Sequence, residues 1–380
     1  MGTTQQIIEK CKDLVSKPDY RHAYLLNIGE RYRGISGYFS NYIPEEIIAV
    51  VRLYPLRIIG FYDTTKNTGN AMFNPVCSFA QDVFSAACFG EFSLLKNIIF
   101  PNSCDSLRVL SQMWEYQISK PKPYILLHPI NVDNDSIEYF VREIKKFADQ
   151  LKKEAGVDFT DADLKKTIDK YNRTRALLRE LYEIRKNNDS FLKGSDAIAL
   201  MTAGLIMDRD EYNAILHQIV EEGKESKAGD DSKKRIMIIG PLVDNYALLD
   251  KIEELGAYVI YDGITNGFRY FDLDVETEGD LYVNIARRYL LSGPSPTINV
   301  SQESVVQSLQ KLVQELDLYG VIYINQKFCE PHVHNYLAIT DTLKHMGVYS
   351  LMLEIEHDGL TADERDLLRV ESFIELAGRN

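Results

Sequence analysis

The chain alternates between short apolar runs and longer segments in which apolar residues recur at helical spacing. In the first third, runs at residues 56–61, 97–101 and 124–129 are bounded by Gly, Pro or Asn, which is typical of buried parallel strands. The alternation returns in the last third, with runs at residues 235–241, 257–262, 320–325 and 349–356. This pattern predicts two similar α/β domains, each built on a parallel sheet.

The segment between these domains has a helical pattern. Long charged amphipathic helices are predicted between residues 137 and 188, and the Thr160 side chain is expected to cap the second of them. Residues 221–234 are charged, contain glycine and have few apolar side chains, which predicts a solvated linker. We therefore expect a leading helix and a Rossmann- or flavodoxin-like domain over residues 1–135, a helical connector over 136–230, and a second such domain over 231–380.

Composition restricts the class of protein. A chain of 380 residues with 45% hydrophobic and 26% charged residues is typical of a folded globular protein. No apolar stretch approaches the roughly 18 residues that cross a bilayer, and no export signal precedes the first helical segment, so we expect a cytoplasmic protein that does not bind membranes. The net charge of -13 disfavours binding to nucleic acid. The five cysteines include no closely spaced pair and fit reduced thiols.

Three cysteines stand out, Cys77 and Cys104 in the first third of the chain and Cys329 near its end. Cys104 and Cys329 follow apolar runs, so we expect the thiols at the carboxyl ends of strands, where open parallel sheets bind ligands. Three thiolates can hold an iron–sulfur cluster, and because a complete set normally numbers four, one iron would stay open. From spacing alone, ordinary buried thiols are the alternative, since free cysteine packs as a small hydrophobe.

Several motifs occur in an order that is specific to one family. They are YIPEEII at residues 42–48, CSFAQ at Cys77, PNSCDSLR at Cys104, HP at His128, DGITNGFR at residues 262–269 and KFCEPHVHNY at Cys329. Through them the chain resembles the 2-hydroxyacyl-CoA dehydratase and ATP-dependent benzoyl-CoA reductase family, over residues 38–376.

The resemblance implies a cofactor and partners. It implies that Cys77, Cys104 and Cys329 ligate an iron–sulfur cluster, of the 4Fe-4S type or larger, in a heterodimer with a homologous larger subunit. It also implies a cluster-containing ATPase activator, a ferredoxin upstream and an acyl-CoA substrate. The chain has no GxxxxGK[ST] loop, so the ATPase is expected to be another protein. Cys11 is expected to be a half-buried helix thiol, and Cys88 a reserve ligand for a larger cluster.

Two further residues are predicted to be catalytic. By the resemblance, Glu46 matches the glutamate that follows proline in the family's PEE motif, and burial would raise its pKa towards that of a general acid or base. Its alternative role is that of an acidic residue in the first turn of a helix. His332 is expected to donate protons or hydrogen bonds near the cluster, and the same is expected of His128 and His334. The alternative is that the three are ordinary loop histidines.

The reaction is the least determined part of the sequence interpretation. CEPHVHNY resembles the reductase side, while Val50-Val51-Arg52 replaces the Ala-Ala-Gly of most relatives and is expected to add charge near the site. Residues 292–304 lack the basic residues of several dehydratase subunits. We interpret the chain as the iron–sulfur subunit of a benzoyl-CoA reductase that passes low-potential electrons to an aromatic acyl-CoA. The alternatives are the small subunit of a 2-hydroxyacyl-CoA dehydratase, which eliminates water through a ketyl radical, and an assembly module without a cluster.

Overall fold

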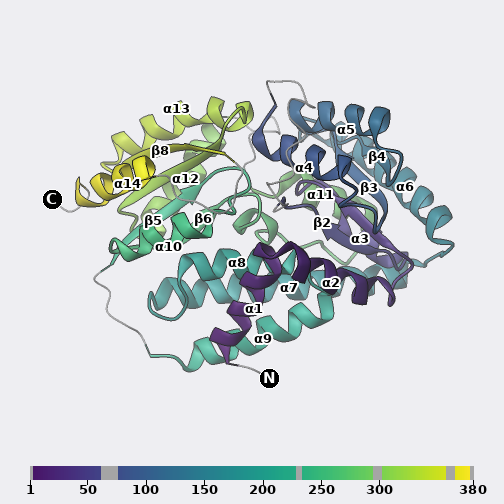
Figure 1. Cartoon of the computed structure of the whole chain (residues 1–380), viewed down its shortest axis with the longest axis horizontal. Coiled ribbons are helices and arrows are strands. Elements are labelled where there is room, and N and C mark those ends of the chain that lie inside the picture. The colour runs from purple at the N-terminus through teal and green to yellow at the C-terminus, as the bar shows by residue number, and fades with distance from the viewer. Residues whose placement is uncertain (1–2, 61–75, 228–232, 294–301, 357–363, 377–380) are drawn as a thin grey trace.

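The computed structural model describes residues 3–60, 76–227, 233–293, 302–356 and 364–376. It contains two four-stranded sheets, in which every pair of neighbouring strands is parallel. The first has the order β2-β1-β3-β4 and the second the order β6-β5-β7-β8, so both repeat one topology. The prediction of two similar parallel-sheet α/β units is thereby confirmed. The sheets lie side by side, the second at the left and the first at the right of Figure 1.

The strand bounds agree best with the prediction in the second sheet. Its strands, each starting within one residue of the predicted position, are β5 (Lys234–Ile239), β6 (Ala257–Gly263), β7 (Gly320–Gln326) and β8 (Tyr349–Ile355). The first sheet consists of β1 (Ile35–Tyr38), β2 (Tyr54–Arg57), β3 (Leu95–Pro101) and β4 (Lys122–Leu126). The run at residues 56–61 therefore marks the end of β2 rather than its centre, and β1 was not predicted.

β1 escapes sequence interpretation because it is short and includes Ser36 and Gly37. Gly37 is nevertheless required at this place, since a Cβ atom there would lie 2.6 Å from Cδ1 of Leu95 on the neighbouring strand. The close approach of β1 and β3 is what brings the first sheet together.

Helices cover the sheets and connect their strands. In the first half these are α1 (Thr4–Ser16), α2 (Pro18–Gly29), α3 (Glu45–Val50), α4 (Ser78–Cys88) and α5 (Asp105–Gln117). The second half has α10 (Tyr246–Glu254), the 3-10 helix η1 (Phe268–Tyr270), α11 (Leu281–Leu291), α12 (Gln302–Leu316), α13 (Glu330–His345) and α14 (Glu364–Leu376). No helix in the described ranges is long and apolar enough to cross a membrane.

Four helices lie between the two halves in the chain, namely α6 (Asn134–Ala155), α7 (Asp161–Asn187), α8 (Gly194–Gly204) and α9 (Arg209–Glu225). Thr160 caps α7 as predicted, through a reciprocal capping box with Asp163. The expected linker at residues 221–234 is wrong at its start, because α9 continues to Glu225 and Gly223 is buried against Phe191. Residues 228–232 of that segment lie outside the described ranges, and the two boundaries between the three expected domains stay a prediction.

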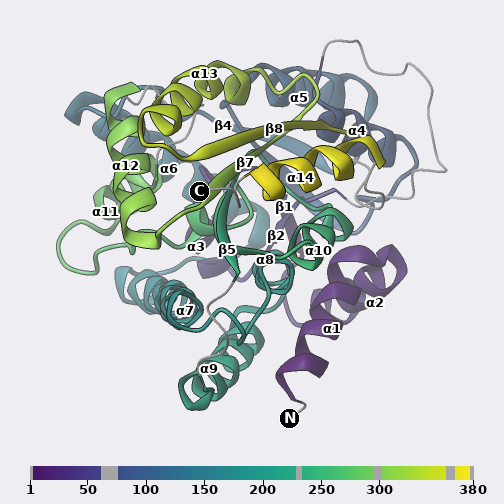
Figure 2. The same ribbon diagram turned by 90° about the vertical axis from the view of Figure 1, so that its left-hand side faces the viewer.

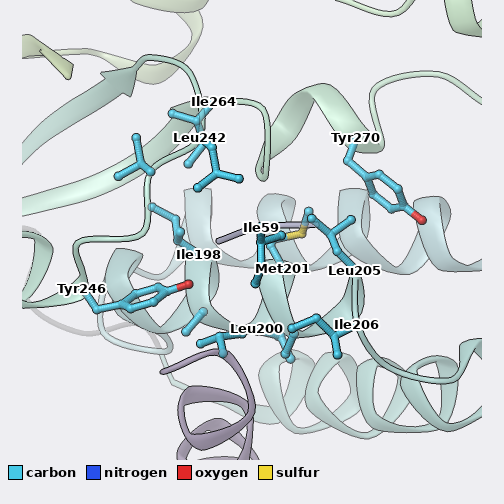
Figure 3. Close-up of a cluster of buried hydrophobic side chains, with 14 of the residues drawn as sticks. Ile59, Ile198, Leu200, Met201, Leu205, Ile206, Leu242, Tyr246, Ile264 and Tyr270 are labelled. Atoms are coloured by element: carbon cyan, nitrogen blue, oxygen red, sulfur yellow. The ribbon is translucent and has the colours of Figure 1, made fainter. Parts of the chain in front are cut away.

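α8 forms the centre of the molecule, and each of its residues is buried. Most of its residues are apolar or small, and its polar side chains Ser195, Asp196 and Thr202 are each paired, so the helix can be buried on every side. Figure 3 shows Met201 of α8 beside Ile59 from the first half, and Ile198 of α8 on the side of Leu242 and Ile264 from the second. The two sheets are therefore fixed against each other by one continuous core, which sets the geometry of whatever lies between them.

Candidate functional site

Folding brings three cysteines to one cavity between the two sheets. Cys77 and Cys104 come from the first half and Cys329 from the second, and all three line a cavity of about 130 Å³. Most of the rest of its described wall consists of apolar and uncharged polar side chains, including Phe39, Ser40, Asn41, Phe79, Leu107, Leu242 and Thr265. The expected convergence of the three thiols is thus present, although their role as ligands stays a prediction.

Each of the three cysteines is the N-cap residue of a helix. Cys77 precedes α4, Cys104 precedes α5 and Cys329 precedes α13. Both views place α5 and α13 on the same side of the molecule, above the layer of α7, α8 and α9 (Figures 1 and 2). The positive ends of three helix dipoles therefore meet near the thiols, which favours negative charge on sulfur.

Burial opposes that charge. Burial raises the pKa of Cys104 to about 11 and also raises the pKa values of Cys77 and Cys329 above the ordinary range. Each thiol also interacts with the backbone amide three residues later, and this hydrogen bond lowers its pKa. The amides are those of Ala80, Leu107 and His332. Thiolates in this cavity consequently require bound cations, because a coordinating metal deprotonates a thiol outright.

Hydrogen bonds fix the cysteine segments to their surroundings. The Cys77 amide donates to Oγ of Ser106, 3.1 Å away in the first turn of α5, so the segments of Cys77 and Cys104 are joined. The Cys329 amide donates to the carbonyl of Gln326 at the end of β7, 3.0 Å away. Between them Phe328 has a φ of 63°, a left-handed conformation that a bulky residue adopts only under constraint. The backbone thus turns sharply to deliver Cys329.

The cavity also has two positive side chains, which were not predicted from the sequence. Arg57 and Arg269 line it, whereas no Asp or Glu is among the described residues of its wall. Arg57 ends β2 and Arg269 lies on η1, a few residues beyond β6. Basic residues just past the ends of parallel strands are the signal that would have identified them. For a chain with a net charge of -13, two positive and no negative side chains among the described wall residues are a marked local reversal.

His332 is the one predicted catalytic residue that lines the cavity. Its side chain is buried, and burial, with a further contribution from Arg269, holds its pKa well below the ordinary value, so the imidazole is neutral. The Tyr323 hydroxyl donates to the carbonyl of His332 at 2.7 Å and lies 3.3 Å from its Nδ1 atom. A neutral imidazole in this position is able to donate one hydrogen bond into the cavity.

Glu46 lies elsewhere, in a buried network outside the cavity wall. Its carboxylate accepts hydrogen bonds from Arg175 of α7 and from the Tyr289 hydroxyl of α11, the latter at 2.7 Å. The expected rise of its pKa is wrong: burial acts to raise it, but Arg175 and Arg288 outweigh burial and lower the pKa below the ordinary value. Glu46 is therefore ionised and paired, which favours a structural role, and its catalytic role stays a prediction.

Cys88 and Cys11 do not reach the cavity. Cys88 is exposed at the far end of α4, which by helix geometry is about 16 Å from Cys77. Cys11 is buried on α1, deeper than the half-burial expected, with Glu211 in electrostatic range. Neither thiol is thus placed to join Cys77, Cys104 and Cys329 around a larger cluster.

The other sequence candidates also lie outside the cavity wall. His128 is buried against the ring of Tyr42, with 4.4 Å between ring centroids, and burial lowers its pKa. His334 is exposed on α13. Arg52 was expected to add charge near the site, but it is exposed in the turn after α3, with a φ of 61°. Residues 294–301, which include most of the segment poor in basic residues, lie outside the described ranges.

Donor spacing distinguishes kinds of metal site. In the described part of the chain, no three His, Cys, Asp or Glu side chains converge closely enough to hold a single metal ion. In a cluster each thiolate ligates a different iron, so its cysteines lie farther apart than the ligands of one ion.

Comparison with known proteins places the chain in a family. The family model described as 2-hydroxyglutaryl-CoA dehydratase, D-component, matches residues 40–376. The chain belongs to this family. The match begins after β1 and contains the other seven strands and all three cavity cysteines.

Several curated relatives are subunits of enzymes that act on CoA thioesters. The β subunit of lactoyl-CoA dehydratase from Anaerotignum propionicum is 24% identical over 99% of this chain and 100% of its own length. A subunit of benzoyl-CoA reductase from Thauera aromatica is 25% identical, covering 87% of each chain. The β subunit of (R)-2-hydroxyglutaryl-CoA dehydratase from Acidaminococcus fermentans is 23% identical over 87% of this chain and 88% of its own length. The recognition of this dehydratase and reductase family from sequence motifs is thereby confirmed.

Proposed function

We propose that this chain is the iron–sulfur subunit of an enzyme that delivers low-potential electrons to an acyl-CoA thioester. The observation that carries the proposal is the cavity itself, in which Cys77, Cys104 and Cys329 converge from both halves of the molecule. Family membership supports it, because the named relatives are subunits of dehydratases and of a reductase that act on CoA thioesters.

The residues of the cavity fit such a cofactor. Three thiols supply soft donors, and the two guanidinium groups together with the lack of carboxylates in the described wall suit an anionic occupant. Cys77, Cys104 and Cys329 would hold the cluster, which when bound would supply reversible one-electron transfer at low potential. A set of three thiolates leaves one coordination position for water, sulfide or another ligand.

The protein's own residues have distinct parts in this proposal. The helix amides that follow each cysteine stabilise negative charge on the sulfurs. Phe39, Phe79 and Leu107 present apolar surface to the cavity, which lowers the local dielectric constant and strengthens charge interactions there. His332 would donate a hydrogen bond towards the bound group.

The proposal includes partners and a location. By analogy with relatives that are each named as one subunit of a larger enzyme, the chain would act with a homologous larger subunit. A separate cluster-containing ATPase, reduced by a ferredoxin, would supply the electron, because the sequence has no phosphate-binding loop of its own. Five cysteines without disulfide bonds fit the reducing cytoplasm.

Two reactions are candidates. Our first is the dearomatising reduction of an aromatic acyl-CoA, as the name of the Thauera aromatica relative indicates for that protein. The second is dehydration of a 2-hydroxyacyl-CoA, which is favoured by the full-length match to the lactoyl-CoA dehydratase subunit. Identities of 25% and 24% do not separate the two.

Iron and acid-labile sulfide analysis of the full chain, purified without oxygen, tests the cluster. A brown protein with iron and sulfide in about equal amounts supports the proposal. A colourless, iron-free protein, both alone and with its partner subunit, would support the assembly-module alternative instead.

Electron stoichiometry then separates the reactions, in an assay with the partner subunit and ATPase. Stoichiometric consumption of reductant with benzoyl-CoA supports the reductase. Many turnovers of a 2-hydroxyacyl-CoA after a single activating reduction support the dehydratase.

A further inference from the structure

We propose that Arg269 compensates the negative charge of the bound cluster and thereby raises its reduction potential. The inference rests on the proposed function, since it concerns the same cavity. It assigns a role to a residue that the family motif DGITNGFR contains but does not explain.

Arg269 occupies a shared wall of two cavities. It lines the cavity of the three cysteines and also a larger neighbouring cavity of about 350 Å³, whose walls include Tyr261, Phe268 and Leu309. His332 and Gly293 are common to both cavities. Arg269, Cys329 and His332 line the same cavity, which brings the guanidinium to the place of the proposed cluster.

This cation has no partner in the described part of the chain, where no hydrogen bond or ion pair of Arg269 is present. A carboxylate in electrostatic range is that of Asp272, which accepts a hydrogen bond from the Gly293 amide and makes none with Arg269 among the described residues. Arg269 is half-buried, and a half-buried charge that makes no hydrogen bond or ion pair within the described residues is free to face an anion in the cavity.

Arg57, the other cation of the cavity, provides a contrast. Its Nη1 atom donates to Oδ1 of Asn41 at 2.9 Å, and its guanidinium lies 5.6 Å from the centre of the Tyr38 ring. The Tyr38 hydroxyl in turn donates to Glu45, 2.9 Å away, so a carboxylate shares the field of Arg57. Arg269 lacks an equivalent arrangement and is the cation whose charge is available to the cavity.

The loop before Arg269 is rigidly held. The Asp262 carboxylate accepts from the Phe268 amide at 2.7 Å and from the Tyr182 hydroxyl. The Asn266 side chain accepts from the Val243 amide at 3.0 Å and donates to the Val243 carbonyl at 2.8 Å. A Cβ atom at Gly267 would lie 2.0 Å from the Asp262 carboxylate, so glycine is required there. The motif therefore fixes the backbone from which Arg269 extends, so that its charge is in place before any electron arrives.

The effect of the charge follows from electrostatics. Three thiolates outweigh the positive charge of the iron–sulfur core, so the site is anionic and becomes more so when it accepts an electron. A nearby cation stabilises the reduced form more than the oxidised form, which raises the potential. Because much of the described cavity wall is apolar, solvent screens this interaction less than at an exposed surface.

The test is an EPR-monitored redox titration of the full chain, prepared without oxygen, comparing Arg269→Gln with Arg269→Lys. At the wild-type midpoint potential, Arg269→Gln should lower the ratio of reduced to oxidised cluster about tenfold, which for one electron equals a shift of about 59 mV to more negative values. Arg269→Lys keeps the charge and should recover most of the ratio. Arg108→Gln is the matched control, because Arg108 lies in the turn after Cys104 but is exposed and pairs with Asp105.

The outcomes separate this inference from the proposed function. Iron-free wild-type protein would overturn both. The inference alone would be overturned if wild-type protein carries the cluster and Arg269→Gln leaves the ratio of reduced to oxidised cluster unchanged. It would also be overturned if Arg269→Gln shifts that ratio no more than Arg108→Gln does. If Arg269→Gln raises the KM for the acyl-CoA but leaves the reduction potential of the cluster unchanged, the inference is also overturned, because Arg269 would then bind the substrate. If Arg269→Gln binds no iron, retention of the cluster in Arg269→Lys supports the charge role, and loss in both variants contradicts it.

Discussion

Cys104 and Cys329 occupy equivalent positions in the two halves of the molecule. Each follows the third strand of its sheet, β3 or β7, and each is the N-cap of the helix that comes next. Cys77, between β2 and β3, has no such counterpart, because the sequence between β6 and β7 contains no cysteine. A cluster in this cavity would be held by two thiols of one half and one of the other, so its binding would depend on the packing of both halves.

The first prediction concerns iron. Replacing Cys77, Cys104 or Cys329 singly by Ala should reduce iron and sulfide per chain to background levels, because each removes one of the three thiols of the cavity. Cys88→Ala is the matched control and should keep wild-type iron, since Cys88 is exposed at the other end of α4. A Cys329→Ala protein that stays brown, or a Cys88→Ala protein that loses iron, would contradict the ligand assignment.

The second prediction concerns the buried pair of Glu46 and Arg175, whose side chains are both 0% exposed. Glu46→Ala leaves the guanidinium buried without its partner and should reduce the free energy of unfolding by about 3–5 kcal/mol. Urea denaturation of the iron-free proteins measures this change. The exposed pair of Lys165 and Glu278 is the control, and Glu278→Ala should cost less than about 1 kcal/mol. If Glu46→Ala and Glu278→Ala lost equal free energies of unfolding, burial of the Glu46–Arg175 pair would not increase its contribution to stability.

The third prediction is the pH dependence of that pair. The folded pKa of Glu46 lies below its unfolded value, about 4.3, so its contribution to stability is present above that pH and is lost as pH falls through the folded pKa. The difference in unfolding free energy between wild type and Glu46→Gln should therefore be constant at neutral pH and shrink under acid conditions. Denaturation series from about pH 7 to pH 3 measure it. A difference that grew on acidification would mean a raised pKa, as a general acid requires.

The sequence predicts some of these features because they depend on local patterns. Cys104 and Cys329 follow apolar runs that are recognisable as strands, and the Thr160 cap needs only the residues next to it. Arg175 is 129 residues away from Glu46, and only the packing of α3 against α7 joins them, so no local pattern shows that Glu46 is neutralised. The proposed role of Arg269 could not be predicted for the same reason, because it depends on which side chains surround the guanidinium in the folded chain.

The last prediction uses Arg52, which takes a left-handed conformation in the turn after α3, with a φ of 61°. This is the position after a helix where glycine is preferred, because a Cβ atom there costs roughly 1–2 kcal/mol. Arg52→Gly should raise the free energy of unfolding by about 0.5–1 kcal/mol once the greater freedom of glycine in the unfolded chain is deducted. It should leave iron content unchanged, because Arg52 is exposed and outside the cavity wall.

Lys166→Gly, at an exposed position inside α7, is the control and should destabilise the protein by about 1 kcal/mol. If Arg52→Gly is no more stable than wild type, or binds less iron, then Arg52 has a role at the site that its exposed position does not indicate.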